Sequence, residues 1–150
     1  MTSHLEALLK NWKRIHKQTT KVMASAPNDK YDWKPCDSAI PLGELMNHLW
    51  IAEWGLIEAA MTGAFPKERP EPINDTAALI AAFNKTHEEV VAKVAAMTPE
   101  QLAEEVAPFG PEKKLTRLAL VEITQEHEIH HRGQLFTYLR AAGCEVPSLF

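Results

Sequence analysis

Apolar side chains recur every three or four positions through most of the 150-residue chain. This spacing places them on one face of an α-helix. The pattern predicts four long helices, over about residues 3–25, 41–62, 76–97 and 116–143. In the first of these helices the predicted inward face consists of Leu5, Leu8, Leu9, Trp12, Ile15, Thr19, Val22 and Met23.

Residues that start and stop helices stand where the periodic pattern begins and ends. Pro41 suits the first position of the second helix, and Gly63 suits the position just after its end. Three prolines within residues 66–72 exclude a helix there. Residues 98–101, Thr-Pro-Glu-Gln, match a capping box, which predicts a short helical turn over residues 99–105.

No stretch of the chain alternates apolar and polar side chains between turn residues, so we expect an all-α protein. Amphipathic helices of similar length usually bury their apolar faces against one another as a bundle. We predict a single domain over residues 1–150, a four-helix bundle with long crossover connections. The connection over residues 63–74 reaches up to about 40 Å when extended, and a 20-residue helix is about 30 Å long. It could therefore return along the bundle and leave its two neighbours parallel.

Charge and composition narrow the class of protein. The chain has 16 Lys and Arg against 20 Asp and Glu, a formal net charge of −4, so non-specific nucleic-acid binding is not expected. No apolar stretch approaches the about 18 residues of a membrane span, and the first residues lack the core of a secretory signal. We therefore expect a cytoplasmic protein. Its two cysteines, Cys36 and Cys144, are too few for a disulfide framework and are expected to be reduced.

Histidines are the most informative polar residues, because three of the seven lie within the five residues 127–131. On a helix, His127 and His131 differ by about 40° around the axis, so both imidazoles project from one face. That arrangement lets two ring nitrogens reach one metal ion at about 2.0–2.1 Å. His130 lies about 60° to the other side of His127 and should lean away from the shared direction.

A bundle site needs a third ligand from a facing helix, and His48 is the best candidate. It lies between apolar residues of the second predicted helix, namely Leu45, Leu49 and Ala52. Taken alone, a histidine on an apolar face is more often a hydrogen-bonded core residue than a ligand. The facing pair on the last helix makes a metal site the better interpretation. We assign no role to His4, His16 and His87.

The same segment also matches H-E-x-x-H, the zinc-peptidase pattern in which the glutamate, here Glu128, acts as general base. Peptidases of this type need a further ligand along the chain and usually a strand edge that binds extended peptide. Only 19 residues follow His131, and none of them is a histidine. We therefore do not favour a peptidase.

Two stretches of the sequence resemble a known family. These are LGELMNHL at residues 42–49 and HEIHHRGQLFTYLR at residues 127–140, followed by Gly143 and by Val-Pro at 146–147. They resemble the DinB-like (YfiT-like) metal-binding bundles over essentially the whole chain. The resemblance implies a four-helix bundle with parallel and antiparallel neighbours, usually dimeric. It also implies one divalent metal, zinc or nickel, held by His48, His127 and His131.

The resemblance suggests chemistry as well as a fold. Some relatives look like S-transferases or isomerases that use a low-molecular-weight thiol. Three histidines leave an open position, at which a bound thiol would lose its proton, or a water molecule would become acidic enough for hydrolysis. We expect a small-molecule substrate and a homodimer. The alternative is a non-catalytic, stress-related module, which a three-ligand site disfavours because structural zinc sites normally have four protein ligands.

Several other residues carry expectations that the structure can test. Glu44, Glu128 and Gln134 are candidate outer partners of the metal ligands, although a solvated side chain is the safer interpretation of each. Trp50 and Trp54 should point away from His48, where they could line an oligomer contact. Gly133 lies within the last predicted helix, where glycine is unfavourable. It suggests either that a neighbouring helix or subunit approaches closely or that the glycine is simply tolerated. We interpret Cys36 as a structural residue rather than a nucleophile.

Overall fold

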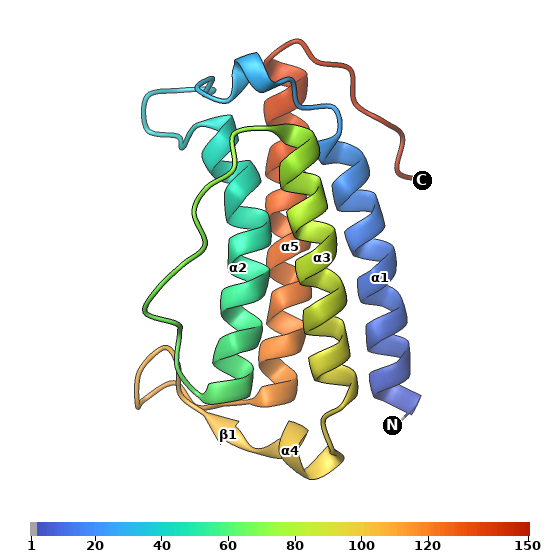
Figure 1. Ribbon diagram of the computed structural model, residues 1–150, viewed down its shortest axis with the longest axis vertical. Helices are drawn as coiled ribbons and strands as arrows, with labels where there is room; N and C mark the ends of the chain where they lie inside the picture. The colour runs from blue at the N-terminus through green and yellow to red at the C-terminus, as the bar shows by residue number, and fades with distance from the viewer. Residues whose placement is uncertain (1–2) are drawn as a thin grey trace.

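The computed structural model describes residues 3–150, in which four long helices pack side by side as a bundle (Figure 1). The long helices are α1 (Ser3–Met23), α2 (Leu42–Thr62), α3 (Thr76–Ala95) and α5 (Arg117–Ala141). The short elements are the 3₁₀ helix η1 (Asn28–Lys30), α4 (Pro99–Ala103), β1 (Glu105–Val106) and β2 (Leu115–Thr116). Each helix begins and ends within two residues of its predicted limits, so the predicted fold class is confirmed.

The connection between α2 and α3 sets the topology of the bundle. In Figure 1, α1 and α5 run upward, whereas α2 and α3 both run downward. The chain over residues 63–75 therefore returns along the outside of the bundle, and it leaves α2 and α3 parallel. Helix α5 packs against both α1 and α2, which brings the histidine-rich segment next to α2.

Local chemistry explains where α2 begins and ends. Pro41 has an extended backbone and is the N-cap, so the helix begins at Leu42 and not at Pro41 as predicted. Gly63 follows the helix with a φ of 86°, a left-handed conformation that glycine adopts at little cost. Gly43 is also required, because a Cβ there would lie 2.7 Å from the ring of Tyr31.

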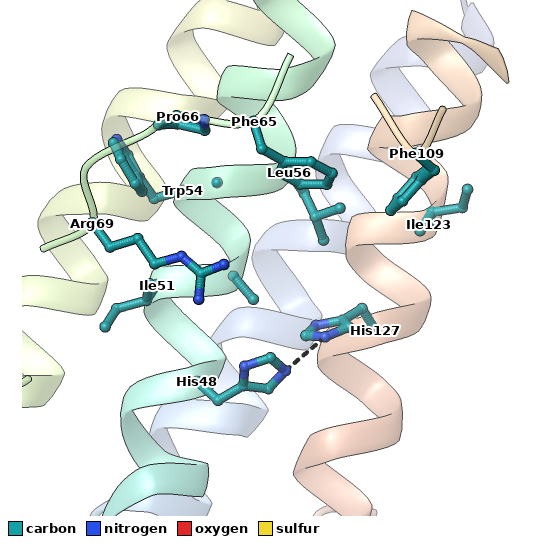
Figure 2. Close-up of a pocket in the computed structure, with 12 residues that line it drawn as sticks. His48, Ile51, Trp54, Leu56, Phe65, Pro66, Arg69, Phe109, Ile123 and His127 are labelled. Atoms are coloured by element: carbon teal, nitrogen blue, oxygen red, sulfur yellow. Dashed lines mark hydrogen bonds between the residues drawn. The ribbon is translucent and has the colours of Figure 1, made fainter. Parts of the chain in front are cut away.

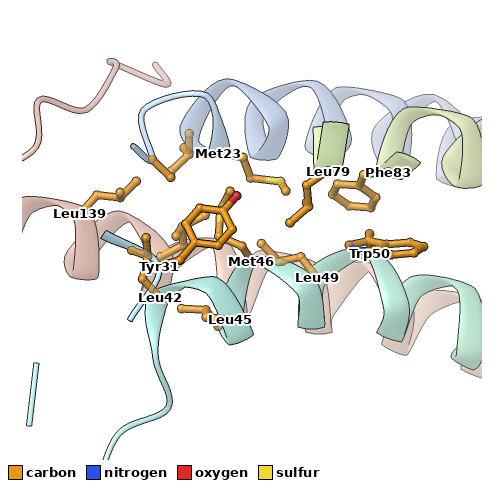
Figure 3. Close-up of a cluster of buried hydrophobic side chains, with 13 residues drawn as sticks. Met23, Tyr31, Leu42, Leu45, Met46, Leu49, Trp50, Leu79, Phe83 and Leu139 are labelled. Carbon is orange, nitrogen blue, oxygen red and sulfur yellow. The ribbon is translucent and has the colours of Figure 1, made fainter. Parts of the chain in front are cut away.

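Two apolar clusters fill the interior, one at each end of the bundle. The cluster near η1 contains Tyr31, Met46 and Trp50, together with side chains from all four long helices (Figure 3). The cluster at the opposite end contains Trp12, Ile57 and Val94. Between them along the helices lie four buried titratable residues, one from each long helix, which we name the buried polar layer: His16, Glu53, His87 and Glu128.

The small sheet near the start of α5 was not predicted. Strands β1 and β2 form a two-residue antiparallel ladder, in which Glu105 pairs with Thr116 and Val106 with Leu115. The prediction of no strands was wrong here, because two residues per strand are too few to produce a periodic pattern. The ladder closes the 107–114 loop at the start of α5. Within residues 3–150, no helix combines the length and apolar character that crossing a membrane requires.

Candidate metal centre

The structure brings His48, His127 and His131 together at the α2–α5 contact, which we name the histidine triangle. The Nε2 atom of His48 lies 2.9 Å from that of His127 and 3.1 Å from that of His131. All three side chains are partly exposed. Figure 2 shows the rings of His48 and His127 facing each other across the gap between the two helices. The three nitrogens therefore converge on one point at the protein surface.

The donor set fits a divalent cation. Burial, followed by the charges of the neighbouring histidines, lowers the pKa of His127 to about 4. Burial is also the main cause that lowers the pKa values of His48 and His131. The rings are therefore neutral at pH 7, as metal ligands must be. Their planes meet at 60°, 87° and 65°, so the in-plane lone pairs can point at a shared ion.

Gln134 holds one ligand of the triangle in place. Its side-chain oxygen lies 2.7 Å from Nδ1 of His131, one turn earlier on α5. Because an amide oxygen can only accept, Nδ1 carries the proton and Nε2 keeps its lone pair. Of the three candidate outer partners, this is the one that contacts the triangle. Within residues 3–150, no hydrogen bond joins Glu44 to His48.

Glu128 points into the protein rather than toward the triangle. Its side chain is only 2% exposed, and burial together with the charge of Glu53 raises its pKa to about 8. A general base of a peptidase would instead face the metal ligands from the solvent side. His130 is exposed and lies outside the group of three histidine ligands. Both placements argue against the H-E-x-x-H interpretation.

An apolar cavity of about 290 Å³ opens beside the triangle (Figure 2). Its lining residues come from α2, the 63–75 connection, the 107–114 loop and α5, and they include His48, Trp54, Phe65, Arg69, Phe109 and His127. The expectation for Trp54 was therefore wrong, because its ring lines the cavity that His48 also lines. Trp50 is buried in the core, where its indole nitrogen donates to Asn47, so it does not line an oligomer contact.

The structure contains a second group of residues with metal-ligand chemistry, in the buried polar layer. Ligand-type atoms of His16, Glu53 and His87 lie within 4.8 Å of one another, and all three residues are buried. Nδ1 of His87 lies 3.1 Å from Oε1 of Glu53, and Nε2 of His16 lies 2.8 Å from Oδ1 of Asn84. Sequence analysis assigned these histidines no role. The missed signal was a titratable residue on the apolar face of each long predicted helix.

Two further expectations are resolved by the environment of single residues. A Cβ at Gly133 would meet nothing within 4 Å, so no helix of this chain approaches it. The side chain of Cys36 is exposed to solvent and is not part of the core. A hydrogen bond from Ser38 lowers the pKa of its thiol. Neither residue lies in the histidine triangle.

Comparison with known proteins places these features in a family. The family model of the DinB superfamily matches residues 11–135. The uncharacterized protein YjoA of Bacillus subtilis (strain 168) is 31% identical over 140 residues, which cover 88% of each chain. The crystal structure of this DinB-like protein superposes with a TM-score of 0.78 at 25% identity, covering 95% of this chain and 97% of YjoA.

Two more distant structures share the fold. YfiT from Bacillus subtilis, described as a probable metal-dependent hydrolase with an unusual four-helix bundle topology, has a TM-score of 0.73 at 14% identity and covers 97% of this chain and 91% of its own. The mycothiol-dependent maleylpyruvate isomerase has a TM-score of 0.57 at 18% identity and covers 90% of this chain and 63% of its own. With a family match over most of its length and a four-helix bundle in common, the chain belongs to the DinB superfamily.

Proposed function

We propose that this protein is a metal-dependent enzyme in which His48, His127 and His131 hold one divalent ion, zinc or nickel. The observation that carries the proposal is the convergence of three neutral Nε2 atoms beside an apolar cavity. A divalent ion bound there would acidify a thiol or a water molecule at its open position. The description of YfiT as a probable metal-dependent hydrolase supports the same class of chemistry.

A low-molecular-weight thiol is the cosubstrate that the site supports best. Within residues 3–150, no carboxylate oxygen lies within 4.8 Å of all three histidine nitrogens, so the ligand group itself consists of histidines alone. A free thiol has a pKa of about 8.5, far below the pKa of water, and needs much less help to ionise. The mycothiol-dependent activity in the name of one structural relative agrees with this choice. Hydrolysis remains the second candidate, supported by the description of YfiT.

The first experiment measures the metal content of protein purified without a histidine tag. We expect one divalent ion per chain, and we expect it to be lost in His48→Ala and His131→Ala. His130→Ala is the matched control, because this histidine neighbours His131 but lies outside the triangle. Metal that survives both triangle substitutions would contradict the proposal. Protein with a structural metal but no activity would support the non-catalytic alternative.

The second experiment separates the two reactions. The metal-loaded protein is incubated with an activated electrophile and a panel of thiols that includes cysteine, glutathione and mycothiol. Thiol-dependent loss of the electrophile, absent in His48→Ala, would support transfer. Inactivity with every thiol, together with metal-dependent ester hydrolysis, would support hydrolysis instead.

We also propose that the chain works as a single domain, as a homodimer and in the cytoplasm. The predicted mass in solution is twice the 16.8 kDa of one chain. Light scattering at micromolar concentration measures it, and a mass of one chain would contradict the dimer.

A further inference from the structure

The cavity beside the histidine triangle has walls that suit an apolar molecule. Three of its sides are formed by Ile51, Trp54 and Leu56 of α2, by Phe65 of the 63–75 connection, and by Ile123 of α5. Its volume of about 290 Å³ lies at the lower end of ordinary ligand sites, which span about 300–1,000 Å³. A molecule with one aromatic ring or a short branched chain would fill it.

Two exposed aromatic rings stand at the end of the cavity away from the histidines (Figure 2). Phe65 is 39% exposed and Phe109 is 44% exposed, although both are large apolar side chains. Their ring centroids are 5.3 Å apart in an edge-to-face arrangement, and they come from two different connections. An apolar ligand between these rings would bury surface that now faces water.

Arg69 provides the one positive charge in the cavity lining. Figure 2 shows its guanidinium group directed into the space above His48. Within residues 3–150, Arg69 has no salt bridge, although Glu44 and Glu71 line the groove on its other side. A guanidinium fork left free at a cavity mouth matches the geometry of a carboxylate.

We propose that the substrates of this site are small carboxylic acids with an apolar, aromatic-sized body. This inference rests on the proposed function, because it names the substrate class of the same site. The body lies between Trp54 and the two phenylalanines, and the carboxylate pairs with Arg69. His48 and His127 of the triangle line the same cavity, next to the carboxylate end of the molecule. Neutral molecules of the same shape bind less well because they lack the charge that Arg69 recognises.

The test compares 3-phenylpropionate with its neutral analogue 3-phenylpropionamide on the protein as purified, by NMR titration. We expect the acid to bind roughly tenfold more tightly than the amide, as one charge-assisted pair at a partly exposed site would give. Arg69→Gln should remove this preference and keep the metal content unchanged. Lys67→Gln is the matched control, an exposed cation two residues earlier that does not line the cavity. It should leave the preference intact.

A second variant tests the apolar part of the inference. Phe109→Ala should weaken the acid and the amide by the same factor, because the ring contacts only the body they share. Equal binding of acid and amide to the unsubstituted protein would overturn the proposal, as would absence of binding. A preference that survives Arg69→Gln would overturn it too, since the carboxylate would then bind elsewhere. Metal content measured on the same samples reports separately on the proposed function.

Discussion

The bundle contains two clusters of histidines with opposite surroundings, and the contrast shows what makes a ligand site. In the histidine triangle, steeply inclined rings direct three nitrogens toward one point next to a cavity. In the buried polar layer, the rings of His16 and His87 are stacked with an interplanar angle of 3° and centroids 3.9 Å apart. Lone pairs lie in the ring plane, so two parallel stacked rings cannot both direct them at a common ion.

Hydrogen bonding separates the two clusters further. Asn84 accepts from His16, and Glu53 bonds to His87, so each ring of the buried layer already has a protein partner. Burial lowers the pKa values of both histidines to about 4 and raises the pKa of Glu53 well above its ordinary value. The layer is therefore largely uncharged at neutral pH, as expected for polar side chains buried between two apolar clusters. We therefore expect the layer to be structural, with the proposed chemistry at the histidine triangle.

The largest expected effect is that substitutions in the histidine triangle remove the metal, whereas substitutions in the buried polar layer lower the stability of the fold. His127→Ala should lower metal affinity more than a hundredfold and change stability little, because the side chain is partly exposed. His16→Ala should keep the metal and lower the free energy of unfolding by about 2 kcal/mol or more, because it leaves a cavity where the buried ring packed against Phe83 and His87. Metal analysis and urea unfolding measure the two quantities on each variant. A loss of metal in His16→Ala would break the comparison.

A smaller effect is expected for the residues that orient the histidines. Gln134→Ala removes the acceptor for Nδ1 of His131 and should lower metal affinity by about 10–100-fold. Asn84→Ala removes the corresponding acceptor for His16 and should lower stability by about 1–3 kcal/mol. Competition with a chelator measures the affinity of both variants. Equal losses of affinity would mean that the two clusters are coupled.

The smallest expected effect is a change in the pH dependence of stability. His87 titrates near 6.5 when unfolded but at about 4 in the structure, so the unfolded state binds more protons between these values. Stability is therefore complete above pH 6.5 and falls as the pH drops toward 4, by at most about 1.4 kcal/mol per pH unit for this group. His87→Gln should flatten this fall. Urea unfolding at pH 7, 6 and 5 measures it, and an unchanged slope would show that His87 is not buried neutral.

The sequence was sufficient to predict the parts of the fold that depend on local chemistry. The four long helices follow from apolar periodicity. The end of α2 follows from Gly63, and the start of the short helix α4 follows from Thr98, because both residues act on neighbouring backbone groups. The direction of α3 did not follow, because the 63–74 connection is long enough to reach either end of α2. The β1–β2 ladder was missed because its hydrogen bonds join residues about ten positions apart.

The same division holds for the site. His127 and His131 could be paired from their spacing on one helix, and His48 was the best candidate for a third ligand because it lies between apolar residues of a facing helix. The cavity could not be predicted, because Phe65, Arg69 and Phe109 lie on connections whose paths have no periodicity. The buried polar layer was also missed, since each of its four residues comes from a different helix and looks ordinary in its own segment.

Anomalous diffraction at the zinc and nickel absorption edges from crystals of the untagged protein would test the central claim most directly. We predict one peak per chain, within bonding distance of the Nε2 atoms of His48, His127 and His131, with a fourth position open toward the cavity. A peak between His16 and His87, or a fourth protein ligand that closes the position, would contradict the account.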